Sequence, residues 1–255
     1  MAKGLLQRWN CHRHAVRGHK NHFCLCSLFH LVPKIPCKVT KLSHHLKLPQ
    51  LPLLVAQFLY EQEHPNSPIP VVLVPTKQLP RFIGKIYVYP SLLSIFWAPS
   101  DQSGVHSMCY EHIRSVSSWR NGAARRDCVY IVHDPDLPGF QGLYITQVEA
   151  ILWLSFKPNR CSQCSYPCAV VSWFKTISDA PCPNTGMWMV EREMSNRQKL
   201  MSIIHIDTIL HGSHLVGIGG NRFIPNELKH TDSLHAFKTF FVNKFIDYHA
   251  HELAY

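Results

Sequence analysis

The feature that most constrains the fold of this chain is a series of short apolar runs in residues 125–216, separated by turn-like segments such as 134–139. Short strands that are joined by tight turns are typical of small β-barrels and β-sandwiches. We therefore expect a β-barrel module in this region. The runs that we assign to strands are 128–132, 143–156, 169–174, 187–190 and 202–210.

Basic charge is concentrated near the start of the chain. The 255 residues carry a net charge of +10, yet the first acidic residue is Glu61 and nine basic residues precede residue 48. A basic segment without acids suits a polyanion such as nucleic acid, because binding releases counterions. It is also typical of a solvated, disordered leader. We expect residues 1–47 to form a disordered leader that is rich in Cys and His.

The rest of the chain divides into two segments. Residues 48–103 contain a helical apolar stripe at 49–62, a proline-rich extended stretch and short strands at 85–89 and 92–97. Residues 104–255 form the β-rich module. In this module Leu234, Phe237, Phe241 and Phe245 recur with helical spacing, which predicts a C-terminal helix docked on the barrel. The expected fold class is mainly β with flanking helices, or α+β.

In the long strand at 143–156, the alternation of side chains places Val148, Ala150 and Leu152 on one face. The same alternation places Gln147 and Glu149 on the opposite face.

One basic segment has the composition of a nucleic-acid contact. Arg120, Arg125 and Arg126 lie close to Trp119 in the polar stretch 113–126. Guanidinium groups beside an aromatic ring can bind phosphate while the ring stacks on a base. The alternative is a surface loop whose Trp119 packs on the barrel.

Two groups of residues have the side-chain types of a metal site. Cys161, Cys164 and Cys168, with Cys182 as a fourth ligand, have a spacing that could hold zinc, and Cys168 could equally be a small core residue. His205, Asp207, His249 and His251 would be the ligands of a metal-dependent hydrolase. The Cys and His residues of the leader have poor zinc-finger spacing. No other cofactor is expected.

Several motifs of the chain, in order, resemble the C-terminal region of Plavaka-type fungal DNA transposases over about residues 45–255. The resemblance implies an origin in a mobile element. It also implies that the RNase H-like catalytic core lies upstream of this region and is a possible partner. The motifs are LPLLVAQFLY (51–60), WR (119–120), RDCV (126–129), YPCAVVSWF (166–174), TGMWMV (185–190), HIDTI (205–209) and FVNKFIDYHAHE (241–252).

A weaker resemblance over about residues 125–216 is to a bromo-adjacent homology (BAH) module, a small SH3-like β-barrel. Such modules bind chromatin or partner proteins, which would make Tyr130, Trp173 and Trp188 candidates for a recognition groove. Each of these aromatic residues could equally be a core residue. The predicted C-terminal helix departs from the module, which normally closes with a strand.

Together these observations predict a non-catalytic fragment of a transposase that contacts DNA, chromatin or the catalytic core. Two-metal phosphoryl transfer needs carboxylates to hold the cations, and residues 1–60 contain none. We expect a nuclear protein with no membrane association, and we identify no small-molecule substrate. The alternatives are a zinc-stabilised nucleic-acid-binding protein and a metal-dependent hydrolase.

Overall fold

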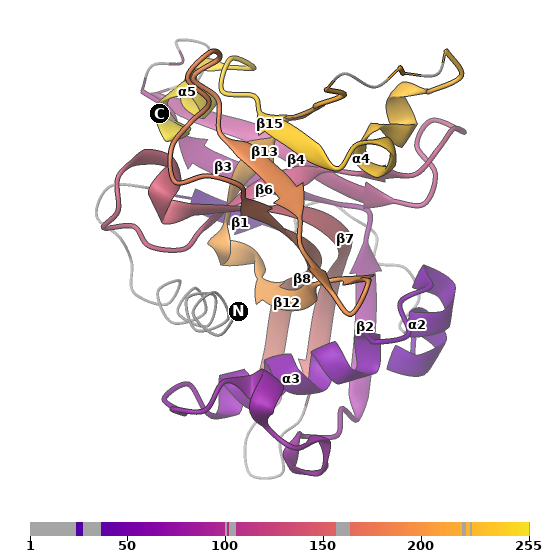
Figure 1. Ribbon diagram of the computed structural model, residues 1–255. Coiled ribbons are helices and arrows are strands. Elements are labelled where there is room, and N and C mark those ends of the chain that lie inside the picture. The colour runs from indigo at the N-terminus through magenta and orange to yellow at the C-terminus, as the bar shows by residue number, and fades with distance from the viewer. Residues whose placement is uncertain are drawn as a thin grey trace.

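Antiparallel β-sheets dominate the fold and curve into a barrel-like structure that is flanked by short helices (Figure 1). The computed structural model describes residues 24–27, 37–99, 101, 106–156, 164–220, 223–224 and 226–254. The sequence-based prediction of a mainly β fold with flanking helices is confirmed at this level.

The larger sheet contains nine strands and follows the order β13-β6-β7-β8-β9-β15-β14, with β12 paired to β8 and β2 paired to β7. Every strand pair in it is antiparallel. The strands are β2 (Gly84–Tyr89), β6 (Cys128–Val132), β7 (Leu143–Phe156), β8 (Cys164–Thr176), β9 (Met189–Arg192), β12 (Met201–His205), β13 (Ile209–Ser213), β14 (Leu215–Gly217) and β15 (Thr239–Val242).

The smaller elements complete the barrel and its ends. A four-stranded sheet has the order β1-β3-β4-β5, and β10 and β11 form a separate hairpin. These strands are β1 (Cys24–Ser27), β3 (Ser91–Trp97), β4 (Met108–Val116), β5 (Arg125–Arg126), β10 (Met194–Ser195) and β11 (Gln198–Lys199). The helices are α2 (Val39–Leu46), α3 (Leu51–Glu63), α4 (Ser233–Ala236) and α5 (Tyr248–Leu253), with the 3-10 turns η1 (Val71–Leu73), η2 (Thr76–Gln78), η3 (Gly139–Gly142), η4 (Ile206–Thr208) and η5 (His230–Asp232).

Strand β8 divides the core, because alternate residues of a strand point to opposite faces. Ala169, Val171 and Trp173 face the barrel interior, where they pack with residues of β3, β4, β6 and β13. The opposite face has two apolar clusters. Cys168 and Val170 pack under α2 and α3, and Phe174 packs with β15, α5 and η3. Ser172 lies on this second face, between the two clusters, and is fully buried.

Helix α3 and the two strands that follow it are as the sequence predicts. Pro52 lies in the first turn of α3, where its missing N–H leaves no hydrogen bond unmade. The apolar stripe of the helix, Leu51, Leu54, Val55, Phe58 and Leu59, is buried against β2, β7 and β12. Strands β2 and β3 are separated only by Pro90, which confirms the predicted break.

The register of β7 corrects one prediction. A β-bulge at Glu149 interrupts the pairing between Val148↔Val171 and Ala150↔Val170. The extra residue turns Val148 to the barrel interior, whereas Ala150 and Leu152 pack on the other face with α3. The prediction that these three residues share a face is therefore wrong.

The C-terminal region also differs from the expected helix. Residues 233–236 form the single turn α4, and Thr239–Val242 form strand β15, which pairs with β9 and β14. Phe240 is fully buried on the edge of Phe174, whereas Phe245 is 62% exposed. Apolar residues of this segment therefore follow a strand period, and the docked C-terminal helix is the later, shorter α5.

Part of the segment that was expected to be disordered is structured. Residues 39–46 form α2, whose Leu42 is buried in the α3 cluster, and residues 24–27 form β1, which pairs with β3. Residues 1–23 and 28–36 of the leader lie outside the described ranges. Within the described ranges, none of the helices combines the length and the apolar character that a transmembrane segment requires.

Candidate polyanion interface

Trp119 lies in the hairpin that joins β4 to β5 and is surrounded by guanidinium groups. The Cζ atoms of Arg114, Arg125 and Arg120 lie 4.8, 5.4 and 5.5 Å from the centroid of its ring. The Trp119 side chain remains partly exposed, and Arg120 is exposed. The hairpin therefore presents a partly exposed aromatic ring with three cations around it.

The backbone at the tip of this hairpin fixes the position of Trp119. Arg120 and Asn121 have φ angles of 50° and 60°, and the Gly122 N–H donates to the Trp119 carbonyl at 2.9 Å. This hydrogen bond closes a four-residue turn whose two central residues both have positive φ. Such a turn is of type I′, the geometry that suits a two-stranded hairpin. Asn tolerates this conformation better than Arg does, so Arg120 is held there at some conformational cost.

Asp127 ties the arginines to the base of the hairpin. Its Oδ1 accepts from Nε of Arg125 at 2.8 Å, and its Oδ2 accepts from the backbone N–H of Arg114 at 2.9 Å. Arg125 and Arg126 are neighbours on β5, so their side chains point to opposite sides of the hairpin. Arg125 faces Trp119, and Arg126 faces Glu149, with Nη1 3.1 Å from Oε2.

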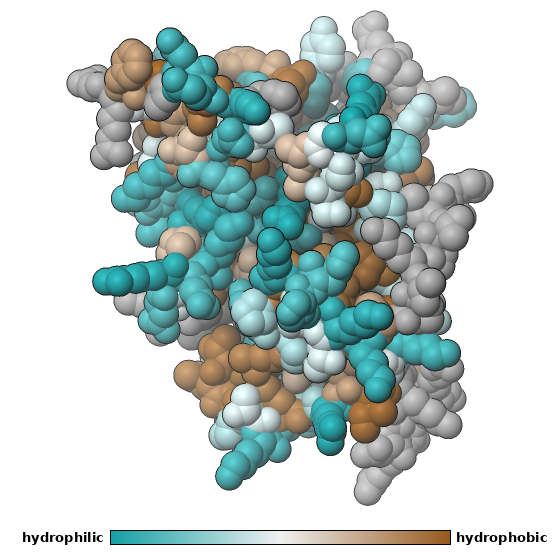
Figure 2. Space-filling model, turned by 90° about the vertical axis from the view of Figure 1, so that its right-hand side faces the viewer, coloured by the Kyte–Doolittle hydropathy of each residue, from teal (hydrophilic) through white to brown (hydrophobic). Residues whose placement is uncertain are grey.

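A groove runs along the Arg126 side of the hairpin and has helix α2 as its other wall. Its volume is about 1040 Å³. Lys41 and His45 line it from α2, Lys47 lines it from the C-cap of that helix, and Ser117 and Ser118 line it from the hairpin. Figure 2 views the molecule from the side on which α2 lies in Figure 1, and hydrophilic side chains cover much of that face.

The α2 residues of this groove are absent from the sequence-based set of candidates. Lys41 and His45 are four residues apart on one helix, which places them on the same face. That spacing was visible in the acid-free segment 1–47. Because we expected this segment to be disordered, we did not consider which of its residues would share a helical face.

The three aromatic candidates of the BAH-like region do not form a surface groove. Tyr130, Trp173 and Trp188 are 0%, 3% and 6% exposed. Trp173 packs in the barrel interior and donates from Nε1 to Ser202 Oγ, while Tyr130 and Trp188 belong to the cluster around Phe174. The structure therefore assigns them to the core.

The proposed cysteine site does not assemble in the part of the chain that the structure describes. Cys164 and Cys168 lie on one strand, four residues apart, which is a separation of about 13 Å. Cys168 is fully buried, and burial raises the pKa of its thiol. Cys182 lies in the loop after β8, and Cys161 lies outside the described ranges. No three His, Cys, Asp or Glu side chains in those ranges are grouped to hold a metal ion.

The four residues of the hydrolase alternative are likewise dispersed. His205 Nδ1 lies 3.0 Å from Asp207 Oδ2 at the start of η4. His249, on α5, is buried and stacks on Phe96 with ring centroids 4.8 Å apart. His251 contacts Phe245 instead.

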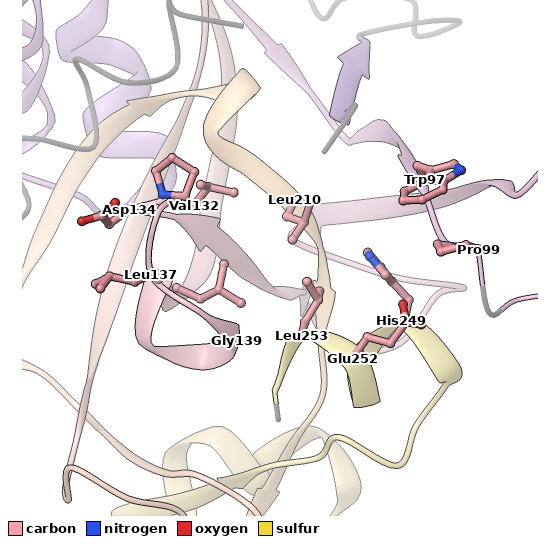
Figure 3. A pocket seen from close by; sticks show the side chains of 13 residues that line it. Trp97, Pro99, Val132, Asp134, Leu137, Gly139, Leu210, His249, Glu252 and Leu253 are labelled. Carbon is pink, nitrogen blue, oxygen red and sulfur yellow. The ribbon is translucent and has the colours of Figure 1, made fainter. Parts of the chain in front are cut away.

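His249 borders a small cavity of about 170 Å³, shown in Figure 3. Trp97, Val132, Leu210 and Leu253 supply much of its wall, together with Asp134 and Glu252. In Figure 3 the side chain of Asp134 points away from His249. Its Oδ1 accepts from the backbone N–H of Asp136 at 3.0 Å. Asp134 therefore stabilises the turn that follows it.

Comparison with protein-family models, curated proteins and solved structures finds no match for this chain.

Proposed function

We propose that this protein is a nucleic-acid-binding module that grips a single strand between the β4–β5 hairpin and helix α2. The single observation that carries the proposal is the ring of Arg114, Arg120 and Arg125 around a partly exposed Trp119, beside a groove lined by further cations. Proteins that bind single strands combine a basic groove for the backbone with aromatic platforms for the bases.

The charge at this interface supports a polyanion. Six cationic side chains border the hairpin and groove: Arg114, Arg120, Arg125, Arg126, Lys41 and Lys47. Their acidic neighbours are Asp127, Glu149 and Glu111. The surplus is positive, although residues 48–255 as a whole are close to neutral. A local surplus of this kind attracts phosphates and releases counterions on binding.

The motifs that resemble Plavaka-type transposases support a role in a protein derived from a mobile element. In that setting the module is non-catalytic: it binds DNA or a chromatin protein in the nucleus, and it contacts the transposase catalytic core if that core is expressed. The hairpin motif WR and the RDCV motif at the end of β5 both belong to the resemblance and both border the interface.

The test is the affinity of the full chain for a fluorescein-labelled single-stranded DNA, measured by anisotropy. Arg120→Asn removes one guanidinium and keeps a residue that tolerates the left-handed turn. We expect Arg120→Asn to weaken binding three- to tenfold, and Trp119→Ala to weaken it about tenfold, because stacking contributes about 1–3 kcal/mol per base.

The matched control is Arg81→Asn. Arg81 is exposed, and it belongs neither to the hairpin nor to the lining of the groove. We expect its affinity to equal that of the wild type. If Arg120→Asn and Trp119→Ala bind as tightly as Arg81→Asn does, the hairpin is not the interface.

A further inference from the structure

A buried ionic network lies at the inner end of the groove, at the β-bulge of β7. The side chain of Glu149 is 2% exposed, and both of its oxygens are engaged. Oε2 lies 3.1 Å from Nη1 of Arg126, and Oε1 lies 3.0 Å from Nζ of Lys199. Ser172 Oγ also donates to Oε1, at 3.1 Å. The carboxylate is therefore fully satisfied by these three neighbours.

A third cation, Arg192, contacts this network through Ser172. Arg192, on β9, donates from Nη1 to Ser172 Oγ at 3.0 Å and from Nη2 to Gln147 Oε1 at 3.1 Å. Its guanidinium also stacks over the ring of Phe174 at 4.7 Å. These contacts fix the position of Arg192. The single negative charge of Glu149 is therefore surrounded by three positive charges, those of Arg126, Lys199 and Arg192.

Among the described residues, Arg126 and Lys199 keep donors that no neighbour uses. A guanidinium has five N–H donors and an ammonium has three, whereas each of these side chains uses one donor on Glu149. Their side chains remain 32% and 25% exposed. Both cations contact the same carboxylate, one at each oxygen, and a guanidinium and an ammonium can donate together to one tetrahedral anion.

The charges of the same three cations also act on the ring of His235, which lies on α4. Partial burial, together with the charges of Lys199, Arg192 and Arg126, lowers the pKa of His235, and the charge of Glu149 offsets this only in part. An anion bound among these cations would therefore raise the pKa of His235.

We propose that Arg126 and Lys199 together bind a phosphate group beside the Glu149 carboxylate. Arg126 and Glu149 line the groove, so the site opens into it on the Arg126 side. The identification of the phosphate as part of a nucleic-acid strand rests on the proposed function, whereas affinity for phosphate itself does not. The phosphate is either the terminal monoester of the strand or an internal diester.

The first experiment measures thermal unfolding of the full chain in 10 mM inorganic phosphate and in chloride of equal ionic strength. A ligand that binds only the native state stabilises it in proportion to ln(1 + [L]/Kd). We expect phosphate to raise the Tm of the wild type. Lys199→Met should abolish most of the increase. Lys175→Met should retain it, since Lys175 pairs with Glu191 at 2.9 Å and not with Glu149. An equal increase in Lys199→Met would overturn the site.

A second measurement is made on the wild-type protein and uses a variant only to assign a signal. The Hε1 signal of His235, assigned by comparison with His235→Gln, is titrated by NMR in the wild-type protein with and without inorganic phosphate. We expect the midpoint to move to higher pH in phosphate. A midpoint that stays in place in saturating phosphate contradicts the proposal.

The source of the phosphate is decided by oligonucleotides with a 5′-phosphate or a 5′-hydroxyl. Tighter binding of the 5′-phosphorylated strand, lost in Lys199→Met, identifies a terminal monoester. Equal binding of the two, weakened about fivefold by Lys199→Met, identifies an internal diester. Phosphate stabilisation without strand binding would reject the proposed function and support this site, whereas strand binding that neither phosphate nor Lys199→Met affects would reject this site alone.

Discussion

At the scale of single residues, Glu149 shows how a polar group is accommodated inside a β-rich core. The bulge on β7 releases it from the regular alternation and places its carboxylate among Arg126, Lys199 and Ser172. A buried carboxylate without such partners would be strongly destabilising. The sequence alone suggested Arg126 as a candidate binding residue but did not predict its contact with Glu149, because this contact joins residues far apart in the chain.

Glu61 is the residue whose environment makes stability depend on pH. It lies in the last turn of α3, and burial raises the pKa of its carboxyl from 4.5 to about 8. Between these values the folded state binds a proton that the unfolded state has released. The contribution of Glu61 to stability is therefore most favourable below pH 4.5 and declines as the pH rises towards 8.

We expect Glu61→Gln to stabilise the protein at pH 8 by on the order of 2 kcal/mol, since the amide carries no charge to bury. The gain should shrink towards zero near pH 4.5. The measurement is urea unfolding at several pH values, with Glu63→Gln, an exposed residue of the same helix, as the control. A gain that does not vary with pH would contradict this account of Glu61.

At the scale of elements, β15 is the strand that distinguishes the structure from the sequence-based expectation. A helix through residues 231–245 would bury Phe241 and Phe245 together. The strand instead buries Phe240 and Val242, and it leaves Phe245 exposed beyond its end.

We expect Phe240→Ala to lower the free energy of unfolding by about 3–5 kcal/mol, the usual cost of removing a buried aromatic ring. Phe245→Ala, its matched control, should change it by less than about 0.5 kcal/mol. The free energies of unfolding of the two variants, measured with denaturant, show whether residues 239–242 form a strand or part of a helix. A large loss for Phe245→Ala with a small loss for Phe240→Ala would favour the helix.

The elements that could be predicted are those with one unambiguous pattern. Helix α3 carries an apolar stripe over 13 residues, and β2 and β3 are delimited by Pro90. Strand β4 was not predicted because much of it is polar and its residues 110–112 are exposed. In the four residues of β15, neighbouring phenylalanines fit a helical and a strand period equally well.

At the scale of the whole molecule, the fold brings basic residues from distant segments to one face. Helix α2, the β4–β5 hairpin and β11 supply cations to a groove and to its inner end. Composition predicted a polyanion partner but placed the basic charge in the leader. Only the packing of α2 beside the hairpin shows that the described part of the chain has a basic surface of its own.

The salt dependence of single-stranded DNA binding tests this central claim most directly. Each phosphate contact contributes about −0.7 to the slope of log K against log[salt] for a single strand. The double variant Arg120→Asn/Lys41→Ala removes one cation from the hairpin and one from α2, so we expect a slope shallower by about 1.4 than that of the wild type. An unchanged slope in the double variant would contradict the account and place the phosphate contacts elsewhere in the chain.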